Sequence, residues 1–394
     1  MLFNSSVIGG NENVTADFKK MINNAYTIAL FSPSLVGGGA ERAVANLSQS
    51  LVQHGLTVHL LLARANGQML PDISPDVRVV DFKQDHVTRT LPHLIDYLHT
   101  EHPAILFSFQ THANLVALLA AQLARTTART IVSEHLVLSY NAKATPGLKE
   151  GLLPWLARIF YRRADAIVAV SRGVADDLVN VVGISSNKLH VIYNPVVTPE
   201  LSEKMQIVPF HPWFAPGTPP VVLAVGRLTA QKDYPTLLRA FALARQEREL
   251  HLLILGEGEK RPELEDMVKS LGLKNDVQMP GFAANPYAYM AHASVFVLSS
   301  AWEGLPTVLV EALACGTPVV STDCKSGPAE ILDYGRYGVL VPVGDHEKLS
   351  REILNAINSR PDKKALRARG ETFSVERATE AYLTLFRSLL SENA

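Results

Sequence analysis

Short apolar runs alternate with longer segments of helical period along the whole chain from Tyr26 onward, and this alternation constrains the fold more than any other feature. Apolar runs without a polar face are typical of a parallel sheet that helices cover on both sides. In the first half of the chain the pattern predicts strands at Tyr26–Ser32, Thr57–Ala63, Val77–Phe82, Ala104–Phe109, Arg129–Ser133, Ala166–Val170 and Lys188–Tyr193. It predicts helices between them at Ala40–His54, Thr88–Thr100, Ala113–Arg125, Gly147–Arg163 and Arg172–Val181.

A proline-rich segment then separates this half from a second alternation of the same kind. Proline opposes regular structure, so the segment that contains Pro199, Pro209, Pro212, Pro216, Pro219 and Pro220 is interpreted as a linker. After it the sequence predicts strands at Val221–Val225, His251–Leu255, Val277–Met279, Val295–Leu298, Pro318–Ser321 and Tyr337–Val341. A final amphipathic run, Val375–Leu390, has no strand after it.

The prediction is therefore an α/β protein with two Rossmann-like, doubly wound parallel-sheet domains that face a cleft. A chain of 394 residues is long enough for two such cores. We expect an N-terminal extension (1–25), an N-terminal domain (26–200), a linker (201–219), a C-terminal domain (220–372) and a last helix (373–394) that either closes the second domain or crosses back onto the first. In such sheets ligands bind at the carboxyl ends of the strands.

Net charge, cysteine content and the absence of long apolar stretches bear on which partners and which cellular compartment to expect. With 37 basic and 38 acidic residues the net charge is -1, so no general field attracts nucleic acid, and no nucleic-acid partner is expected. The two cysteines, Cys315 and Cys324, match no metal-ligand spacing and favour a reducing compartment. The first residues do not form a secretory leader, and no apolar stretch is long enough to span a membrane, so we expect a cytoplasmic protein.

The most informative segment is Val295–Pro318, in which a strand, a loop and a helix follow one another. Pro306 suits the start of a helix, and the amides of Thr307 and Val308 at that start favour an anion such as phosphate. Glu303 stands beyond the strand end, and Glu311 stands about one turn into the helix, where it could bind a ribose diol. Read alone, the two glutamates could be ordinary surface charges; the strand, the Gly304-Leu305-Pro306 loop and the helix together favour a sugar-nucleotide site.

A second motif directly follows the first strand of the C-terminal domain. Within Gly226–Asp233, Arg227 offers a planar donor fork and Lys232 a mobile positive charge, which suits the two phosphates of a nucleoside diphosphate. The alternative is a pair of surface cations in a loop. Because these cations could neutralise the diphosphate and no Asp-x-Asp triplet occurs in the chain, we expect neither a metal nor another cofactor.

A third motif, Gly37-Gly38-Gly39-Ala40-Glu41-Arg42, follows the first strand and opens the first helix. Glycines let backbone amides approach a ligand at a helix N-terminus, although a plain tight turn would need them too. A dinucleotide fingerprint would require glycine where Arg42 stands and an acidic residue near Arg64, so NAD and FAD are rejected. If a group is transferred from a sugar nucleotide to a second substrate, Gly38 and Gly39 are expected on the side of the sugar nucleotide (the donor side). Glu41 and Arg42 are expected on the side of the second substrate (the acceptor side).

Two further strand ends carry polar residues. Ser133-Glu134-His135 ends one strand of the first domain, and Phe109-Gln110-Thr111-His112 ends its neighbour. We expect His135 to contact the transferred sugar and Glu134 and His112 to lie on the acceptor side. A single histidine at such a position is often purely structural, and that alternative applies to both.

Taken together, these segments resemble retaining glycosyltransferase family four, which has the GT-B fold and includes bacterial polysaccharide and glycolipid transferases. The resemblance covers the chain from Tyr26 to about Leu390. It rests on the motifs above and on Ala164–Ser171, Tyr193-Asn194-Pro195, Gly226-Arg227-Leu228, Gln231-Lys232-Asp233, Gly256-Glu257-Gly258 and Pro280-Gly281-Phe282. The first 25 residues match nothing in that family.

The resemblance implies roles for individual residues. Glu303 would contact the donor sugar, Glu311 the ribose, and Arg227 and Lys232 the leaving diphosphate. Gly256, Glu257, Gly258 and Phe282 would line the base pocket. It further implies that the reaction retains the anomeric configuration without a covalent enzyme nucleophile. We expect transfer of a hexose or N-acetylhexosamine from a UDP-sugar to a glycan acceptor linked to a lipid. Charge developing on the nucleotide would be stabilised by the cations and the helix start, and a donor phosphate oxygen would take the acceptor proton.

Three alternatives remain open at this point. The segment Leu152–Arg163 mixes aromatic residues with arginines, which suits a helix at an anionic membrane surface or one that buries its aromatics in the domain. A sugar-nucleotide 2-epimerase would use the same fold and donor. A non-catalytic subunit would bind the donor for a partner enzyme, although the presence of both Glu303 and the phosphate-binding cations argues against it.

Overall fold

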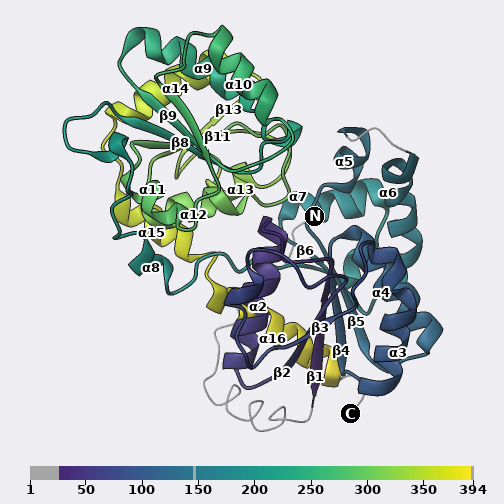
Figure 1. Cartoon of the computed structure of the whole chain (residues 1–394). Coiled ribbons are helices and arrows are strands. Elements are labelled where there is room, and N and C mark those ends of the chain that lie inside the picture. Colours follow the sequence, from purple (N-terminus) through teal and green to yellow (C-terminus); the bar gives the residue numbers. More distant parts are fainter. Residues whose placement is uncertain (1–25, 145–147, 392–394) are drawn as a thin grey trace.

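The computed structural model has two parallel α/β domains, joined by two crossings of the chain (Figure 1). It describes residues 26–144 and 148–391. The expected N-terminal extension, residues 1–25, lies outside the described residues.

The first domain contains a seven-stranded sheet in the order β3-β2-β1-β4-β5-β6-β7. All neighbouring strands pair in parallel. The strands are β1 (Thr27–Ser32), β2 (Thr57–Leu62), β3 (Arg78–Asp81), β4 (Ile105–Phe109), β5 (Arg129–Glu134), β6 (Ala166–Ala169) and β7 (Leu189–Val191). The connecting helices are α2 (Gly39–Gln53), α3 (Leu91–Glu101), α4 (Thr111–Ala124), α5 (Leu138–Ala144), α6 (Leu148–Phe160) and α7 (Arg172–Asp177).

The second domain repeats this plan with six parallel strands in the order β10-β9-β8-β11-β12-β13. They are β8 (Val221–Val225), β9 (His251–Leu255), β10 (Val277–Gly281), β11 (Val295–Leu298), β12 (Val319–Thr322) and β13 (Val339–Val341). Its helices are α9 (Tyr234–Glu247), α10 (Arg261–Ser270), α11 (Pro286–His292), α12 (Thr307–Cys315), α13 (Pro328–Ile331), α14 (His346–Asn358) and α15 (Lys363–Glu371). Two parallel doubly wound sheets are therefore confirmed.

Several predicted boundaries differ from the structure. The short helix α5 was not predicted, because its seven residues carry too little apolar period to be recognised. The helix predicted at Arg172–Val181 changes at Leu178 into a π-helical turn that ends before Gly183, whose φ is 79°. The linker contains α8 (Leu201–Lys204) and a 3-10 turn at Pro212–Phe214 rather than irregular chain alone.

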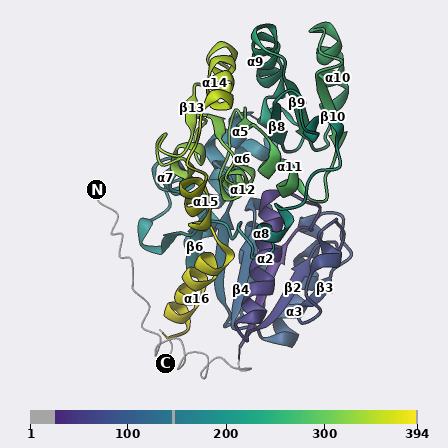
Figure 2. The same ribbon diagram turned by 90° about the vertical axis from the view of Figure 1, so that its left-hand side faces the viewer.

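The last helix, α16 (Val375–Ser391), crosses back and packs against α2 of the first domain. Figures 1 and 2 show α16 beside α2 in the domain that holds β1 to β6. Its apolar face stacks on the first sheet, where the ring centroids of Phe107 and Tyr382 are 5.4 Å apart. The two crossings are also bound to each other, since the amide of Val375 donates to the carbonyl of Val197 at 2.9 Å. The two domains are thus connected at one side by two neighbouring segments of the chain that are hydrogen-bonded to each other.

Apolar packing also continues from one domain into the other. A single cluster of buried side chains includes Val137 and Val174 of the first domain and Leu305 and Leu309 of the second. Burial of apolar surface is the main favourable term in association, so this contact holds the two carboxyl-end faces together.

Candidate active site

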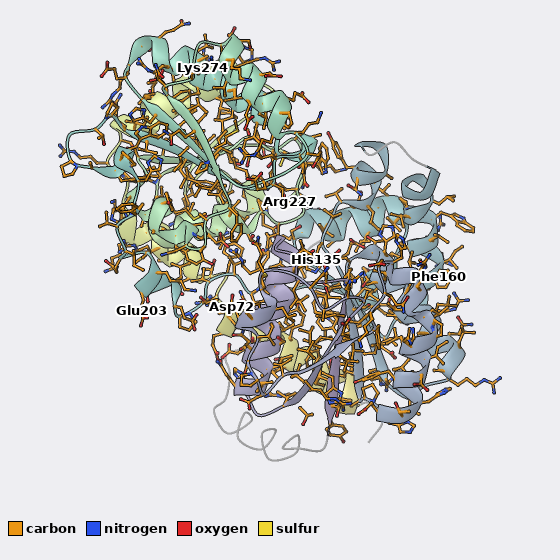
Figure 3. The ribbon with its side chains drawn as sticks, in the orientation of Figure 1. Asp72, His135, Phe160, Glu203, Arg227 and Lys274 are labelled. Carbon is orange, nitrogen blue, oxygen red and sulfur yellow. The ribbon has the colours of Figure 1, made fainter. Side chains whose placement is uncertain are left out.

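The loops at the carboxyl ends of the two sheets contact each other directly. A Cβ atom added to Gly304, after β11, would lie 2.0 Å from the carbonyl oxygen of His135, after β5. A Cβ atom added to Gly39, after β1, would lie 3.1 Å from Oγ1 of Thr307 at the start of α12. Figure 3 shows His135 and Arg227 where the two domains meet, whereas Lys274 and Phe160 lie at the outer sides. Three of the predicted motifs therefore converge on one place.

Glu303 is the centre of a buried polar cluster in the second domain. Its side chain is 8% exposed, and its Oε1 accepts from Nζ of Lys232 at 2.6 Å and from the hydroxyl of Ser300 at 2.7 Å. Its Oε2 accepts from Nε2 of Gln231 at 3.3 Å. A buried carboxylate needs such partners, because an unpaired charge in the interior is strongly destabilising. The fold thus holds one anion and one cation side by side at the strand end.

The loop that carries Lys232 is bound to the loop that carries Glu303. The amide of Ala301 donates to the carbonyl of Gln231 at 2.8 Å, and the hydroxyl of Ser299 donates to the carbonyl of Lys232 at 2.7 Å. The stem of Lys232 passes Gly226, where an added Cβ atom would lie 3.0 Å from its Cε. Arg227 is exposed on the same loop. Two motifs that are far apart in sequence therefore form one rigid unit.

The start of α12 has the free backbone amides on which the predicted anion site depends. Pro306 is its N-cap, and the amides of Thr307 and Val308 precede the first hydrogen bond of the helix, which Leu309 donates to the Pro306 carbonyl at 3.1 Å. The helix ends at Gly316, whose φ of 77° is the left-handed conformation that favours glycine. Helix starts of this kind attract negative charge.

Glu311 of α12 is almost fully buried and is paired across the domain boundary. Nη1 of Arg42, on α2, donates to Oε1 of Glu311 at 2.7 Å, and the carboxylate raises the pKa of Arg42. The second oxygen, Oε2, is buried and makes no hydrogen bond among the described residues. Because an unsatisfied buried acceptor is costly, this oxygen is a candidate acceptor for a ligand hydroxyl. The structure thereby joins residues that sequence analysis assigned to opposite substrates.

The glycine-rich loop meets this boundary through its own first helical turn. The carboxylate of Glu41 lies over Gly38, where an added Cβ atom would be 2.3 Å from Oε2, and its Oε1 accepts from Nε2 of Gln110 at 3.1 Å. Glu41, in the first turn of α2, thus has its side chain held between Gly38 and Gln110 of the β4–α4 turn, and the next residue of the same helix is Arg42.

The residues expected at the base pocket come from three neighbouring loops. The amide of Gly256 donates to the carbonyl of Gly281 at 2.8 Å, and a Cβ atom on Gly256 would lie 2.0 Å from the carbonyl oxygen of Gly226. Glu257 forms an ion pair with Arg261 at 2.7 Å, and Phe282 is 54% exposed. The loops after β8, β9 and β10 therefore lie side by side, and they leave an aromatic face accessible.

His135 is buried at the tip of β5. Its Nε2 lies 3.1 Å from the hydroxyl of Ser133, and its Nδ1 makes no hydrogen bond among the described residues. Burial lowers the pKa of His135 to about 4, so the ring is neutral at physiological pH. A neutral imidazole with one unused nitrogen is able to donate to or accept from a sugar hydroxyl.

Glu134, which was expected on the acceptor side, has its side chain buried in the first domain. Its side chain is 0% exposed and accepts from the hydroxyls of Thr111 and Tyr161 and from two backbone amides. The reason is the alternation of a strand: β5 extends through Glu134, so Ser133 and His135 share one face and Glu134 points to the other. His112 is exposed on the first turn of α4, beside Thr111.

Burial raises the pKa of Glu134 to about 7, and this predicts an unusual pH dependence of stability. Because the folded protein binds this proton more tightly than the unfolded chain does, the carboxylate favours unfolding increasingly as pH rises from about 4.5 through 7. Glu134→Gln removes that effect. We therefore expect the melting temperature of the variant relative to wild type to increase by a few degrees between pH 5 and pH 8, on the scale of ~2–4 °C per kcal/mol. A difference that stays constant with pH in differential scanning calorimetry would contradict this.

Two contacts at the domain boundary were not predicted from the sequence. The rings of Tyr140, on α5, and Trp302, beside Glu303, lie 5.7 Å apart. Glu330 of α13 accepts from the hydroxyl of Tyr193 at 2.6 Å and from the amide of Arg172 at 2.9 Å. The sequence signal for the Tyr140–Trp302 contact is an aromatic residue next to a strand end. We find no sequence signal for the hydrogen bonds of Glu330.

Within residues 26–144 and 148–391, no group of three or more His, Cys, Asp or Glu side chains is arranged to hold a metal ion. In the same part of the chain, no helix has the length and apolar character needed to cross a membrane. Whether the protein works without a metal stays a prediction.

Comparison with protein families and relatives agrees with this geometry. A family described as Glycosyltransferase Family 4 matches residues 37–199, and one described as Glycosyl transferases group 1 matches residues 210–373. The chain is 29% identical over 356 residues to the N-acetylgalactosamine-N,N'-diacetylbacillosaminyl-diphospho-undecaprenol 4-alpha-N-acetylgalactosaminyltransferase of Campylobacter jejuni, covering 88% of this chain and 94% of that protein. It is 32% identical over 234 residues to the lipopolysaccharide core biosynthesis glycosyltransferase LpsE of Rhizobium meliloti, covering 58% of this chain and 66% of that protein.

Among solved structures, Anabaena HepE in complex with UDP and glucose matches with a TM-score of 0.75 and 21% sequence identity. The match covers 92% of this chain and 100% of HepE. At this identity the similarity establishes the shared two-domain fold.

Proposed function

The chain belongs to glycosyltransferase family four, with the GT-B fold, and we propose that it transfers a hexose or N-acetylhexosamine from a UDP-sugar to a lipid-linked glycan. The observation that carries the proposal is the buried Glu303–Lys232 pair at 2.6 Å, held opposite His135 at the contact of the two sheets. Relatives of this chain are named as transferases of lipopolysaccharide and of undecaprenol-linked substrates, which supports the acceptor class.

In the proposed reaction the acceptor oxygen bonds to the anomeric carbon as the bond from that carbon to the diphosphate oxygen breaks. The acceptor proton passes to a diphosphate oxygen, and the configuration is retained without a covalent enzyme intermediate. Lys232, Arg227 and the amides at the start of α12 stabilise the negative charge that develops on the leaving group. Glu303 and His135 hold the hydroxyls of the transferred sugar.

The same groups are proposed to make a metal unnecessary. Two side-chain cations and a helix start supply the positive field that a divalent ion would otherwise provide. Glu311 is proposed to hold the ribose through its unused Oε2. Uridine is proposed as the base.

A thermal-shift screen tests the donor site first. UDP, GDP, ADP and their sugar conjugates are added to the purified protein in the presence of EDTA, so that no metal bridges ligand and protein. A rise in melting temperature for uridine nucleotides alone supports the proposed donor, because a ligand stabilises the state that binds it. A shift confined to another base would replace uridine, and no shift with any nucleotide would contradict the proposed site.

Lys232→Ala is expected to weaken binding of UDP about 10- to 100-fold. The substitution removes a charge that faces the diphosphate and leaves Glu303 without its buried partner. Isothermal titration calorimetry measures the change, and Lys269→Ala, on the exposed surface of α10, is the matched control. Equal affinity of the Lys232 variant and wild type for UDP would remove Lys232 from the site.

A peripheral contact of α6 with the cytoplasmic membrane face is proposed in addition. Leu152 and Trp155 are 54% and 59% exposed, and Arg158, Arg162 and Arg163 beside them are exposed. This combination is typical of a helix at an anionic interface. Of the other aromatics in the segment, Tyr161 is fully buried and takes no part.

Trp155→Ser should lower recovery of the protein with anionic liposomes in a flotation assay at least about threefold, since it removes the largest exposed apolar side chain of α6. Phe210→Ser, at a fully exposed aromatic in the linker, is the control and should float as wild type does. Wild-type protein that stays entirely in the soluble fraction would contradict membrane contact.

A sugar-nucleotide 2-epimerase and a non-catalytic donor-binding subunit remain the competing functions. The epimerase would release UDP and a free sugar without a glycan acceptor, and the subunit would bind donor without turnover. The intact cluster of Glu303, Lys232 and Gln231 argues against a degenerate site.

A further inference from the structure

One buried carboxylate, that of Glu134, receives hydrogen bonds from four donor groups. The hydroxyl of Thr111 lies 3.0 Å from both oxygens, and the hydroxyl of Tyr161 donates to Oε2 at 2.8 Å. The backbone amides of His135 and Leu136 donate to Oε1 at 3.1 and 3.4 Å. With an exposed fraction of 0%, this carboxylate cannot reach any substrate.

The amides that Glu134 binds belong to the segment that meets the second domain. The carbonyl oxygen of His135 lies where a Cβ atom on Gly304 would be 2.0 Å away, so the backbone of His135 rests on the loop that follows Glu303. A rotation of the His135–Leu136 peptide would move this carbonyl oxygen away from the Gly304 loop.

The other side of the carboxylate is anchored in the core. Nδ2 of Asn114 donates to the hydroxyl of Tyr161 at 2.9 Å and to the carbonyl of Ser133 at 2.8 Å. Asn114 in turn accepts from the hydroxyl of Ser108 at 2.8 Å. Satisfied buried networks of this kind are rigid. The network therefore connects α4, β4 and the turn after α6 to the His135 segment.

We propose that Glu134 is a positioning residue, which fixes the His135–Leu136 backbone against the Gly304 loop by accepting its amides. The proposal rests on the proposed function for its catalytic consequence, because His135 is there assigned to the transferred sugar. What matters in this role is an acceptor oxygen at the position of Oε1, and the charge of the side chain is dispensable.

Two nearly isosteric variants separate these properties. Glu134→Gln keeps an acceptor oxygen for the two amides, while its amide group faces the hydroxyl of Tyr161, whose oxygen already accepts from Asn114 and has one lone pair left. Glu134→Met fills similar volume and accepts nothing. Tyr161→Phe is the matched control, since it removes one buried hydrogen bond from the same carboxylate and leaves the backbone amides held.

Hydrogen exchange of the segment 133–137 and steady-state transfer are measured for all four proteins. We expect the amides of His135 and Leu136 to exchange at least ~10-fold faster in Glu134→Met, and within ~3-fold of wild type in Glu134→Gln and Tyr161→Phe. We expect kcat to fall at least ~30-fold in Glu134→Met and to stay within ~5-fold in the other two, with UDP affinity unchanged in all.

Two results would overturn the proposed positioning role of Glu134. Loss of activity in Glu134→Gln equal to that in Glu134→Met overturns the proposal, because the charge would then be required, and unchanged exchange in Glu134→Met overturns it as well. If Glu134→Met does not fold, Glu134→Gln decides by its activity alone. If wild type transfers no sugar, the proposed function fails, and the exchange rates still decide whether Glu134 holds the segment.

Discussion

Glu303→Gln should lower kcat for sugar transfer by about 10²- to 10⁴-fold while the protein stays folded and still binds UDP. Glutamine keeps the shape of the side chain but removes the negative charge that Lys232 and Ser300 are arranged around. A charge held in a buried, preorganised site contributes far more to a transition state than the same charge in water. The variant is assayed for turnover of the nucleotide-sugar, for melting temperature and for UDP affinity.

Glu347→Gln provides the control for this experiment. Glu347 is an exposed glutamate in the first turn of α14, so the same chemical change there should leave kcat at the wild-type value. A Glu303→Gln enzyme with wild-type kcat would show that the carboxylate is only a structural partner of Lys232.

Gly304→Ala should lower kcat at least ~100-fold by separating the two domains. Its Cβ atom would lie 2.0 Å from the carbonyl oxygen of His135 and 2.8 Å from the carbonyl carbon, and backbone on both sides leaves no flexible side chain to yield. Displacements of about 1 Å in an active site are enough for losses of this size. Small-angle scattering should show a larger radius of gyration for the variant, with secondary structure by circular dichroism unchanged.

Gly151→Ala tests whether a Gly-to-Ala change matters in itself. Gly151 lies on α6, and an added Cβ atom there meets nothing within 4 Å, so activity and radius should stay as in wild type. Wild-type transfer by Gly304→Ala would mean that the reaction does not use the closed contact seen between the domains.

The fold could be predicted because the pattern is local. The buried strands are short runs rich in Val, Ile, Leu and Phe, and the change from strand period to helix period can be recognised within each neighbouring pair of elements. The parallel order follows, since such runs need helices on both faces. The motifs after β1, β8 and β11 then fall at the carboxyl ends, where the strand order of each sheet reverses.

Contacts between distant motifs could not be predicted in the same way. Lys232 and Glu303 are 71 positions apart, and Arg42 and Glu311 are 269 positions apart and in different domains. A sequence pattern specifies which face of its own element a residue occupies, but how the two domains dock decides which residues meet. The role of Arg42 as the partner of Glu311 is therefore visible only in the structure.

Glu134 shows how a small error in a strand boundary changes a functional assignment. The predicted strand ended at Ser133, and Glu134, directly after it, was expected on the acceptor side. The strand continues for one more residue, and because side chains alternate along a strand, this extension turns Glu134 into the core and leaves His135 at the domain contact.

Transfer itself is the most direct test of the central claim. The purified protein is incubated in EDTA with a UDP-hexose or UDP-N-acetylhexosamine, with and without a lipid-diphosphate-linked glycan, and UDP release and the anomeric configuration of the product are followed by NMR. Our account predicts that UDP release requires the acceptor and that the new glycosidic bond has the configuration of the donor. UDP release with free sugar and no acceptor, or a product of inverted configuration, would contradict it.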